Sequence, residues 1–178
     1  MTAPAKQSPG PNARIAGAIY VAVFVAGGLA LGSRGTVGAV AGIAAGALYI
    51  AVTWLFYGIF KPVNKSISLV AACVSFAGIA AGPLQRTVNP LVFFGVYCLL
   101  IGYLVFRSTF LPRFLGVLMA FAGLGWLTFA SPALGRTLYP YNLVPGLVGE
   151  GALTLWLLVA GVDTTKWESS RREEQVHV

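Results

Sequence analysis

The chain has 178 residues, of which 57% are hydrophobic and only 10% are charged, and its mean hydropathy is +0.81. Soluble domains carry about 25% charged residues because their surfaces face water, so this composition excludes a soluble globular protein and indicates a surface that faces lipid. The net charge of +7 does not indicate a nucleic-acid partner, because the Lys and Arg residues stand singly or in pairs between apolar runs.

Six apolar runs follow one another along the chain. A helix needs roughly 17–25 residues to cross the hydrocarbon core, so the second run is long and the fourth and fifth are marginally short. Because backbone groups in lipid must bond within their own segment, we predict an all-α polytopic membrane protein, a bundle of six transmembrane helices. The runs are approximately Ile15–Leu31, Val37–Phe60, Ser66–Leu84, Leu91–Phe106, Leu115–Ala130 and Leu143–Gly161.

The chain divides into three parts: a cytoplasmic N-terminal segment over residues 1–14, a transmembrane domain over residues 15–162 and a cytoplasmic polar tail over residues 163–178. Short breaks separate the spans, and prolines stand in them where helices end or begin. We expect the tail to be solvated and partly helical or disordered, with Trp167 at the headgroups. The breaks read GSRGT, KPVNK, QRTVNP, RSTFLPR and SPALGRTLYPYN.

The basic residues predict the orientation of the spans. One side has nine of them, the other has three, and the positive-inside rule therefore places both termini in the cytoplasm of a bacterial inner membrane. The alternative reading of residues 1–35 is a cleaved signal peptide, but its apolar run of about 17 residues exceeds the usual ~7–15, which favours a retained span. The nine are Lys6, Arg14, Lys61, Lys65, Arg107, Arg113, Lys166, Arg171 and Arg172, and the three are Arg34, Arg86 and Arg136.

Glycines repeat at every fourth position on the first three spans. Such rows let helix backbones approach closely, so we expect them to pack the bundle, and a homodimer face is the alternative. The rows are Gly28 with Gly32, Gly38 with Gly42 and Gly46, and Gly78 with Gly82.

Glu150 is the one acidic residue within the apolar runs. It follows Leu143 by seven residues, so it lies roughly 10 Å below the outer end of its helix. A charge at that depth costs on the order of 2.5–3.5 kcal/mol. Three arrangements reduce this cost: a protonated carboxyl, a water-filled cavity, or an ion pair with Arg34, Arg86 or Arg136.

Two side chains come out near the level of Glu150 when residues are counted from the outer ends. Tyr97 and Trp126 can each donate a hydrogen bond, so we predict an intramembrane polar site of Glu150, Tyr97 and Trp126. The functional reading is that Glu150 binds a proton or a cation. The structural reading is that it fastens the last helix, which the absence of a second titratable partner favours.

Catalysis has little support in the sequence. No His or Asp lies within the apolar runs, and general acid–base chemistry needs two such groups in reach of each other. Cys73 and Cys98 form no C-x-x-C pair, so we expect small buried hydrophobes, with a redox pair as the alternative. We therefore predict no catalytic residue, no cofactor and no metal site.

The stretch GYLVFRSTFLPRFLGVLMAFAGLGWL, Gly102 to Leu127, resembles domain of unknown function family 4386, a group of uncharacterised bacterial six-span integral membrane proteins. The family's loop between its fourth and fifth spans reads G-Y-L-V-Y-R-S-x-F-L-P-R-x-L-G. Three further pieces fit: RIAGAIY from Arg14, KPVNKS from Lys61 and VPGLVGEGALTLWLLVAGV from Val144. The resemblance implies a six-span bundle and no assigned activity.

This chain departs from the family in the third span. The family's span carries an Arg and an acid spaced as F-R-L-x-E, and Ser75 and Gly78 stand at those places here. If those charges partner the last-span glutamate in relatives, this chain lacks them. The departure favours a protonated Glu150 over an interior ion pair.

Arg107 and Arg113 bracket a tight cytoplasmic turn, where both can contact lipid phosphates; a soluble-partner site is the alternative. We predict a non-catalytic accessory or lipid-interacting membrane subunit. Its partners are membrane lipids, and a helix-packing homo-oligomer or a membrane partner protein is left open. The alternative is a small transporter or permease-like protein with a protonatable or cation-binding Glu150, and a membrane enzyme ranks third.

Overall fold

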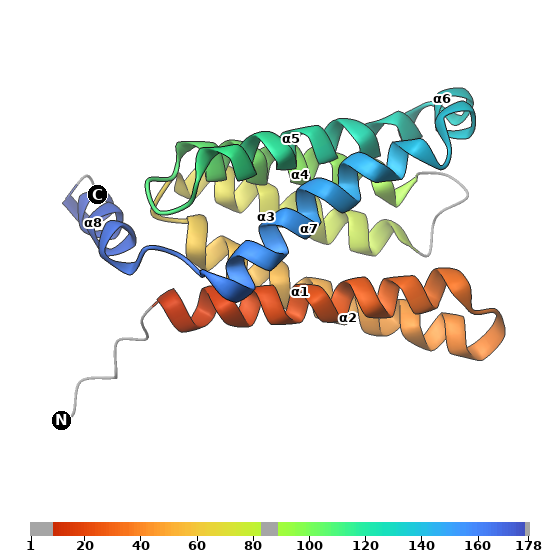
Figure 1. Cartoon of the computed structure of the whole chain (residues 1–178), viewed down its shortest axis with the longest axis horizontal. Helices are drawn as coiled ribbons and strands as arrows, with labels where there is room; N and C mark the ends of the chain where they lie inside the picture. The colour runs from red at the N-terminus through yellow and green to blue at the C-terminus, as the bar shows by residue number, and fades with distance from the viewer. Residues whose placement is uncertain (1–8, 83–88, 177–178) are drawn as a thin grey trace.

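The computed structural model describes residues 9–82 and 89–176, with side chains described for residues 12–82 and 89–173. Lys6, Arg86, His177 and most of the QRTVNP break lie outside these ranges. The elements are α1 (Pro9–Gly32), α2 (Gly35–Phe60), α3 (Lys65–Ala81), α4 (Pro90–Arg107), α5 (Arg113–Leu127), η2 (Thr128–Ala130), α6 (Pro132–Leu138), η3 (Tyr141–Leu143), α7 (Val144–Val159) and α8 (Thr164–Val176), as drawn in Figure 1.

The predicted all-α bundle is confirmed, and the count of six spans holds approximately. Five helical segments are long and apolar enough to cross a membrane. The predicted third span, α3, is also apolar but has 17 residues, at the lower limit of the roughly 17–25 that a crossing needs. The five segments are Asn12–Gly32, Gly35–Phe60, Pro90–Arg107, Arg113–Ala130 and Tyr141–Val159.

Side chains in the breaks start the helices as the sequence leads one to expect. Asn64 accepts a hydrogen bond from the Ile67 amide, and Asn89 accepts one from the Leu91 amide, so each asparagine caps the helix that follows it. Pro90 occupies the first turn of α4, where a missing N–H costs little. Gly35 turns the chain between α1 and α2 with a φ of 68°, a conformation that glycine adopts readily.

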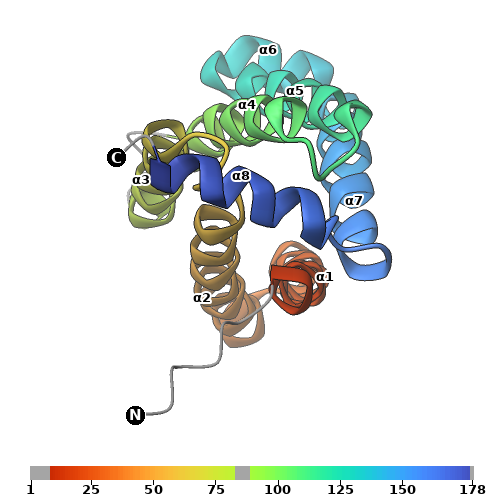
Figure 2. The same cartoon turned by 90° about the vertical axis from the view of Figure 1, so that its left-hand side faces the viewer.

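The helix α7 crosses the bundle diagonally. It leaves α5 near the short helix α6 and reaches α1 at the opposite end (Figure 1). The helix α8 lies across that opposite end, where α1 begins and α2 ends (Figure 2). We call the two ends of the bundle the α8 end and the α6 end.

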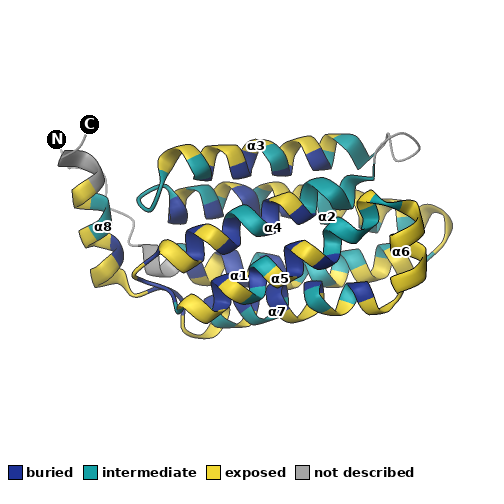
Figure 3. Cartoon of the chain, turned by 90° about the horizontal axis from the view of Figure 1, so that it is seen from above, coloured by how far each residue is buried: buried dark blue, intermediate teal, exposed yellow. Residues whose placement is uncertain are grey.

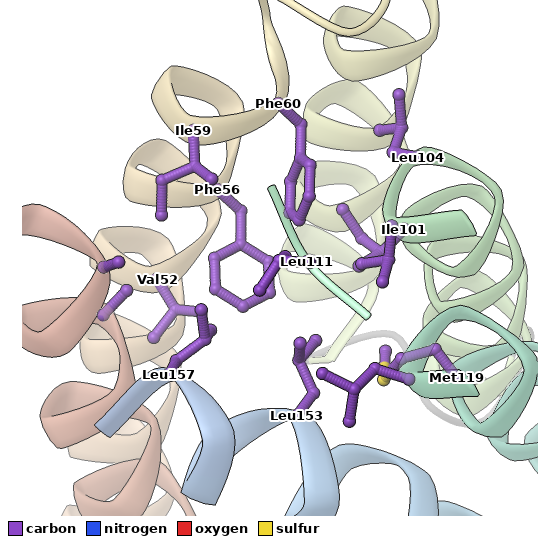
Figure 4. Packing of buried hydrophobic residues seen from close by; sticks show 14 of the residues in the cluster. Val52, Phe56, Ile59, Phe60, Ile101, Leu104, Leu111, Met119, Leu153 and Leu157 are labelled. Atoms are coloured by element: carbon purple, nitrogen blue, oxygen red, sulfur yellow. The ribbon is translucent and has the colours of Figure 1, made fainter. Parts of the chain in front are cut away.

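The buried apolar core lies where α2, α4, α5 and α7 converge. Phe56, Leu104, Met119 and Leu153 meet there, and Leu111 enters from the loop between α4 and α5 (Figure 4). Exposed residues lie on the outer faces of the helices, and α3 lies at the edge of the bundle (Figure 3). Phe110 and Leu111 therefore anchor the R-S-T-F-L-P-R loop to the core, while Arg107 and Arg113 stay exposed.

Close helix packing depends on glycines of α4 and α5. A Cβ added at Gly102 would lie 2.8 Å from the Gly116 carbonyl oxygen, and one added at Gly116 would lie 2.6 Å from the Gly102 carbonyl oxygen. Gly95 and Gly123 make the same reciprocal approach about two helical turns further along. A Cβ added at Gly95 would lie 2.9 Å from the Gly123 carbonyl oxygen, and one added at Gly123 would lie 2.7 Å from the Gly95 carbonyl oxygen. Only glycine lets the two backbones come this near.

Most of the glycine rows predicted from the sequence do not pack helices in this way. A Cβ added at Gly28, Gly32, Gly46 or Gly82 would meet nothing within 4 Å. Gly78 and Gly38 are exceptions. A Cβ at Gly78 would lie 2.9 Å from the Phe93 Cβ of α4, and one at Gly38 would collide with the Ser33 carbonyl oxygen and lie 3.4 Å from the Ala30 carbonyl oxygen of α1. The prediction is wrong for the first row because its side of α1 faces outward.

The tail is helical, and Trp167, which we expected at the headgroups, is buried against the bundle. This side chain is 8% exposed, and its indole Nε1 donates a hydrogen bond of 2.9 Å to the Ile59 carbonyl oxygen. Ile59 lies in the last turn of α2, where carbonyl groups have no partner within the helix. The Asp163 amide also bonds to the Phe110 carbonyl oxygen at 3.2 Å, so α8 is tied both to α2 and to the loop.

Replacing Trp167 with phenylalanine should loosen α8. The variant keeps an aromatic ring but leaves the Ile59 carbonyl without its donor, at a cost of about 1 kcal/mol. We expect faster hydrogen exchange across the α8 amides, measured by mass spectrometry in detergent. Trp54→Phe is the matched control, because Trp54 is 68% exposed. Equal α8 exchange in wild type and Trp167→Phe would contradict the docking role.

Candidate functional site

Glu150 lies at the centre of a buried hydrogen-bonded group. It is 3% exposed and projects from α7. The Tyr20 hydroxyl of α1 donates to its Oε2 at 2.9 Å, and the Trp126 Nε1 of α5 donates to its Oε1 at 2.6 Å. Each carboxyl oxygen therefore has one partner, and the two partners come from different helices.

Three glycines allow α7 to reach both of these helices. A Cβ added at Gly149 would lie 2.9 Å from the Ala122 Cβ of α5, and one at Gly146 would lie 2.7 Å from the Trp126 Nε1. On the other side, a Cβ added at Gly17 of α1 would lie 2.6 Å from the Leu158 amide nitrogen of α7. The diagonal course of α7 thus depends on small residues at both of its contacts.

No basic side chain pairs with Glu150 among the residues whose side chains are described. The two ion pairs in that part of the chain, Lys166–Asp163 and Arg172–Glu168, are exposed. Arg34 and Arg136 belong to the α6 end of the bundle, while Arg86 lies outside the described residues. Of the three arrangements considered from the sequence, the ion pair is not the one found within these residues.

The two donors determine where a proton can sit on the carboxyl group. An indole N–H only donates, so Oε1 accepts from Trp126 whether the carboxyl is charged or neutral. A phenol hydroxyl can donate or accept, so a proton on Glu150 belongs on Oε2, facing Tyr20. The group therefore holds either form without moving a heavy atom.

The structure brings Trp126 to Glu150 but does not bond Tyr97 to it. Tyr97 is 1% exposed, and its hydroxyl has no hydrogen-bond partner in the described part of the chain. Its ring packs edge-on against Tyr49 at 5.8 Å between centroids and stacks on Phe94 at 6.4 Å. Tyr97 thus belongs to an aromatic cluster beside the site.

Tyr20 is the partner that the sequence analysis missed. Counting residues from the outer ends of the spans does not place Tyr20 at the depth of Glu150, because α1 is long and α7 is tilted. Counting from the α8 end does: Tyr20 follows Asn12 by eight residues, and Glu150 precedes Val159 by nine. Tyr20 also closes the RIAGAIY stretch, which resembles the family pattern.

Other buried hydroxyls lie close to this group in the fold. Thr53 and Ser75 share a hydrogen bond of 2.7 Å. The hydroxyls of Tyr49 and Thr154 have no partner among the described residues, as for Tyr97. Thr154 lies one helical turn beyond Glu150 on α7, and the Tyr49 ring packs edge-on against Tyr20 with 6.0 Å between centroids.

The remaining predicted residues lie apart from Glu150. Arg107 and Arg113 are both exposed at the α8 end, and the Arg113 guanidinium stands 5.7 Å above the Phe106 ring. Cys98 is buried as expected, but the expectation is wrong for Cys73, which is exposed. The reason is that α3 lies at the edge of the bundle, so one of its faces has no helix against it (Figure 3).

Comparison with known proteins bears out the family resemblance over part of the chain. Residues 87–161 match the model of a domain of unknown function, DUF4386. An uncharacterised protein of Archaeoglobus fulgidus is 26% identical over 132 residues, which is 64% of this chain and 77% of that protein. No solved structure matches.

Proposed function

We propose that this chain, whose residues 87–161 carry the domain of unknown function DUF4386, is a non-catalytic, lipid-interacting subunit of a bacterial cytoplasmic membrane. In this proposal α3 is the sixth span, and the α8 end, with both termini, faces the cytoplasm. Glu150 fastens helices, and Arg107 and Arg113 contact lipid phosphates.

The hydrogen bonding of Glu150 is the observation that carries the non-catalytic part of the proposal. Its two oxygens are occupied by Tyr20 and Trp126, which come from two other helices. A group arranged in this way links α1, α5 and α7. This geometry is that of a structural hydrogen bond between helices. A catalytic carboxyl must be in hydrogen-bond reach of the group that it protonates or deprotonates, and both oxygens of Glu150 are already bonded to the protein.

The distribution of basic residues supports the lipid-interacting part. Eight basic residues within the described ranges belong to the α8 end, against two at the α6 end. Basic residues beside a membrane attract anionic lipid headgroups, by about 1 kcal/mol each. The eight are Arg14, Lys61, Lys65, Arg107, Arg113, Lys166, Arg171 and Arg172, and the two are Arg34 and Arg136.

The double variant Arg107→Gln/Arg113→Gln should retain less anionic phospholipid than wild type. Losing two contacts of about 1 kcal/mol each predicts roughly 30-fold weaker binding. Native mass spectrometry of delipidated protein titrated with phosphatidylglycerol would measure it. Arg136→Gln, at the α6 end, is the control and should bind as wild type does. If wild-type protein binds no phospholipid, the proposal fails.

A small transporter is the second candidate, and the unpartnered hydroxyls of Tyr49, Tyr97 and Thr154 favour it. A polar group that accommodates a carboxyl in either protonation state could pass a proton to such neighbours. This candidate predicts proton flux in proteoliposomes that Glu150→Gln abolishes at an unchanged amount of folded protein. Absence of flux in wild type, or equal flux in the variant, would contradict it.

A further inference from the structure

A pocket of about 420 Å³ opens at the α8 end. Its walls are the loop residues Thr109–Pro112, the end of α7, the linker Gly161–Asp163 and the first turn of α8. Small-molecule sites typically measure about 300–1,000 Å³, so the pocket has room for a ligand. It lies beside the R-S-T-F-L-P-R loop but does not include Glu150 or its partners.

One side of the pocket carries two opposite charges. Lys166 Nζ stands 3.5 Å from Asp163 Oδ2, and these side chains are 61% and 40% exposed. Exposed pairs of this kind contribute little, so a ligand can separate the two groups at small cost. Each charge is therefore available to an opposite charge on a bound molecule.

The two carboxylate oxygens of Asp163 differ in their partners, and Oδ2 has only the exposed ion pair with Lys166. Its Oδ1 accepts from the Thr165 hydroxyl at 2.7 Å and from the Lys166 amide at 3.2 Å, which caps α8. The Thr165 hydrogen bond and the Lys166 amide lower the pKa of Asp163, so it is ionised at neutral pH. Oδ2 remains to accept from a donor in the pocket.

Apolar side chains also line the pocket, and one of them contacts an exposed aromatic ring on α5. Phe110, Leu111 and Trp156 line it. The Trp156 ring packs edge-on against Phe114, with 5.9 Å between centroids, and Phe114 is 52% exposed on the outside of α5. The pocket thus spans the border between charged groups and a surface that acyl chains can cover.

We propose that this pocket binds the headgroup of a phospholipid that carries a primary amine, an ethanolamine phospholipid, with its phosphate at Lys166 and its ammonium at Asp163 Oδ2. The acyl chains leave over Trp156 and Phe114. This inference rests on the proposed lipid-interacting function and adds a headgroup class and a pocket on the same loop, whose lining does not include Arg107 or Arg113.

The charges of the pocket select this class over other lipids. A headgroup with negative charge alone would meet the Asp163 carboxylate, and like charges repel. A choline headgroup has no N–H to donate to Oδ2, whereas an ammonium has three. A soluble phosphoethanolamine has no chain to cover the apolar wall.

The test is competition between headgroups on the same protein. Full-length protein is delipidated in detergent and titrated with equimolar ethanolamine, choline and glycerol phospholipids of identical chains, and bound species are counted by native mass spectrometry. Wild type should prefer the ethanolamine lipid. Asp163→Asn keeps a capping oxygen but removes the charge, and the preference should fall by about tenfold, the loss expected for one charge-assisted hydrogen bond.

Three further variants complete the design. Ala160→Phe places a ring inside the pocket wall and Lys166→Gln removes the phosphate contact, and both should lose the preference. Glu168→Gln is the control, because Glu168 is an exposed acid of the same helix and does not line the pocket. Circular dichroism checks that each variant is folded.

The outcomes separate this inference from the proposed function. Binding of phospholipids without headgroup preference, or a preference that Asp163→Asn, Lys166→Gln and Ala160→Phe all leave intact, overturns the pocket assignment while the contacts of Arg107 and Arg113 stand. Displacement of the lipid by free phosphoethanolamine at equal concentration would identify a soluble ligand and also overturn it. A wild type that binds no phospholipid overturns both.

Discussion

Glu150→Ala is expected to destabilise the bundle by about 2–4 kcal/mol, whereas Glu150→Gln stays within about 1 kcal/mol of wild type. Alanine leaves the Tyr20 hydroxyl and the Trp126 indole N–H buried without an acceptor. Each such group costs about 1–3 kcal/mol in general. Two such groups together cost about 2–6 kcal/mol, and side-chain hydrogen bonds inside membrane bundles average nearer ~0.6 kcal/mol, so we expect the loss in the lower part of that sum.

Glutamine can keep both hydrogen bonds. Its amide oxygen accepts from Trp126, and its amide nitrogen donates to the Tyr20 hydroxyl, which can act as an acceptor. Thermal unfolding in detergent, followed by the loss of helical circular dichroism, would measure the difference between the two variants. Glu168→Ala is the control, because that acid is exposed on α8.

Two results would contradict this account of Glu150. If Glu150→Ala unfolds at the wild-type temperature, the carboxyl does not fasten α1, α5 and α7. If Glu150→Gln loses as much stability as Glu150→Ala, a neutral amide cannot replace the carboxyl, and a negative charge is needed at the site.

Gly116→Ala should destabilise the protein more than any alanine placed in the glycine row of α1. The new Cβ would lie 2.6 Å from the Gly102 carbonyl oxygen and 2.7 Å from the Phe106 amide nitrogen. Both are backbone atoms, so α4 and α5 must move apart. Overpacking of this kind costs about 1–3 kcal/mol, and occasionally more. The measurement is the unfolding temperature together with the fraction of monodisperse protein after gel filtration.

Gly28→Ala and Gly46→Ala are the matched controls. A Cβ at either position would meet nothing within 4 Å, and alanine is a better helix former than glycine by about 1 kcal/mol. We expect no loss of stability from either. If Gly28→Ala destabilised the protein as strongly as Gly116→Ala, the outward face of α1 would be packed in the membrane, against a second copy of the chain or another protein.

The lipid-facing class and the helical architecture could be predicted from the sequence. Apolar runs such as Val37–Phe60 are long enough to cross a bilayer. Lipid offers no partner for backbone groups, so a helix is the structure that such a run can adopt. The sequence also placed Trp126 in the same polar site as Glu150, to which it donates a hydrogen bond, for a related reason. Helices rise by a constant ~1.5 Å per residue, so depth can be counted.

What the sequence could not supply is which faces meet. Gly28 and Gly32 stand four residues apart on the outward side of α1, whereas the glycines that pack α4 against α5 are seven residues apart, Gly95 with Gly102 and Gly116 with Gly123. The four-residue spacing therefore did not identify the helix faces that meet. The position of Trp167 in the sequence predicts an interfacial tryptophan. In the structure its indole donates a hydrogen bond to the Ile59 carbonyl oxygen, 108 residues away in the chain.

The composition and hydropathy of this chain therefore determined that its surface faces lipid and that its segments are helical. Both properties follow from the chemistry of single segments in lipid. The tertiary structure decided the diagonal path of α7, the pairing of Glu150 with Tyr20 and the docking of α8. These depend on helix tilt and rotation, which are set by packing between segments far apart in the chain.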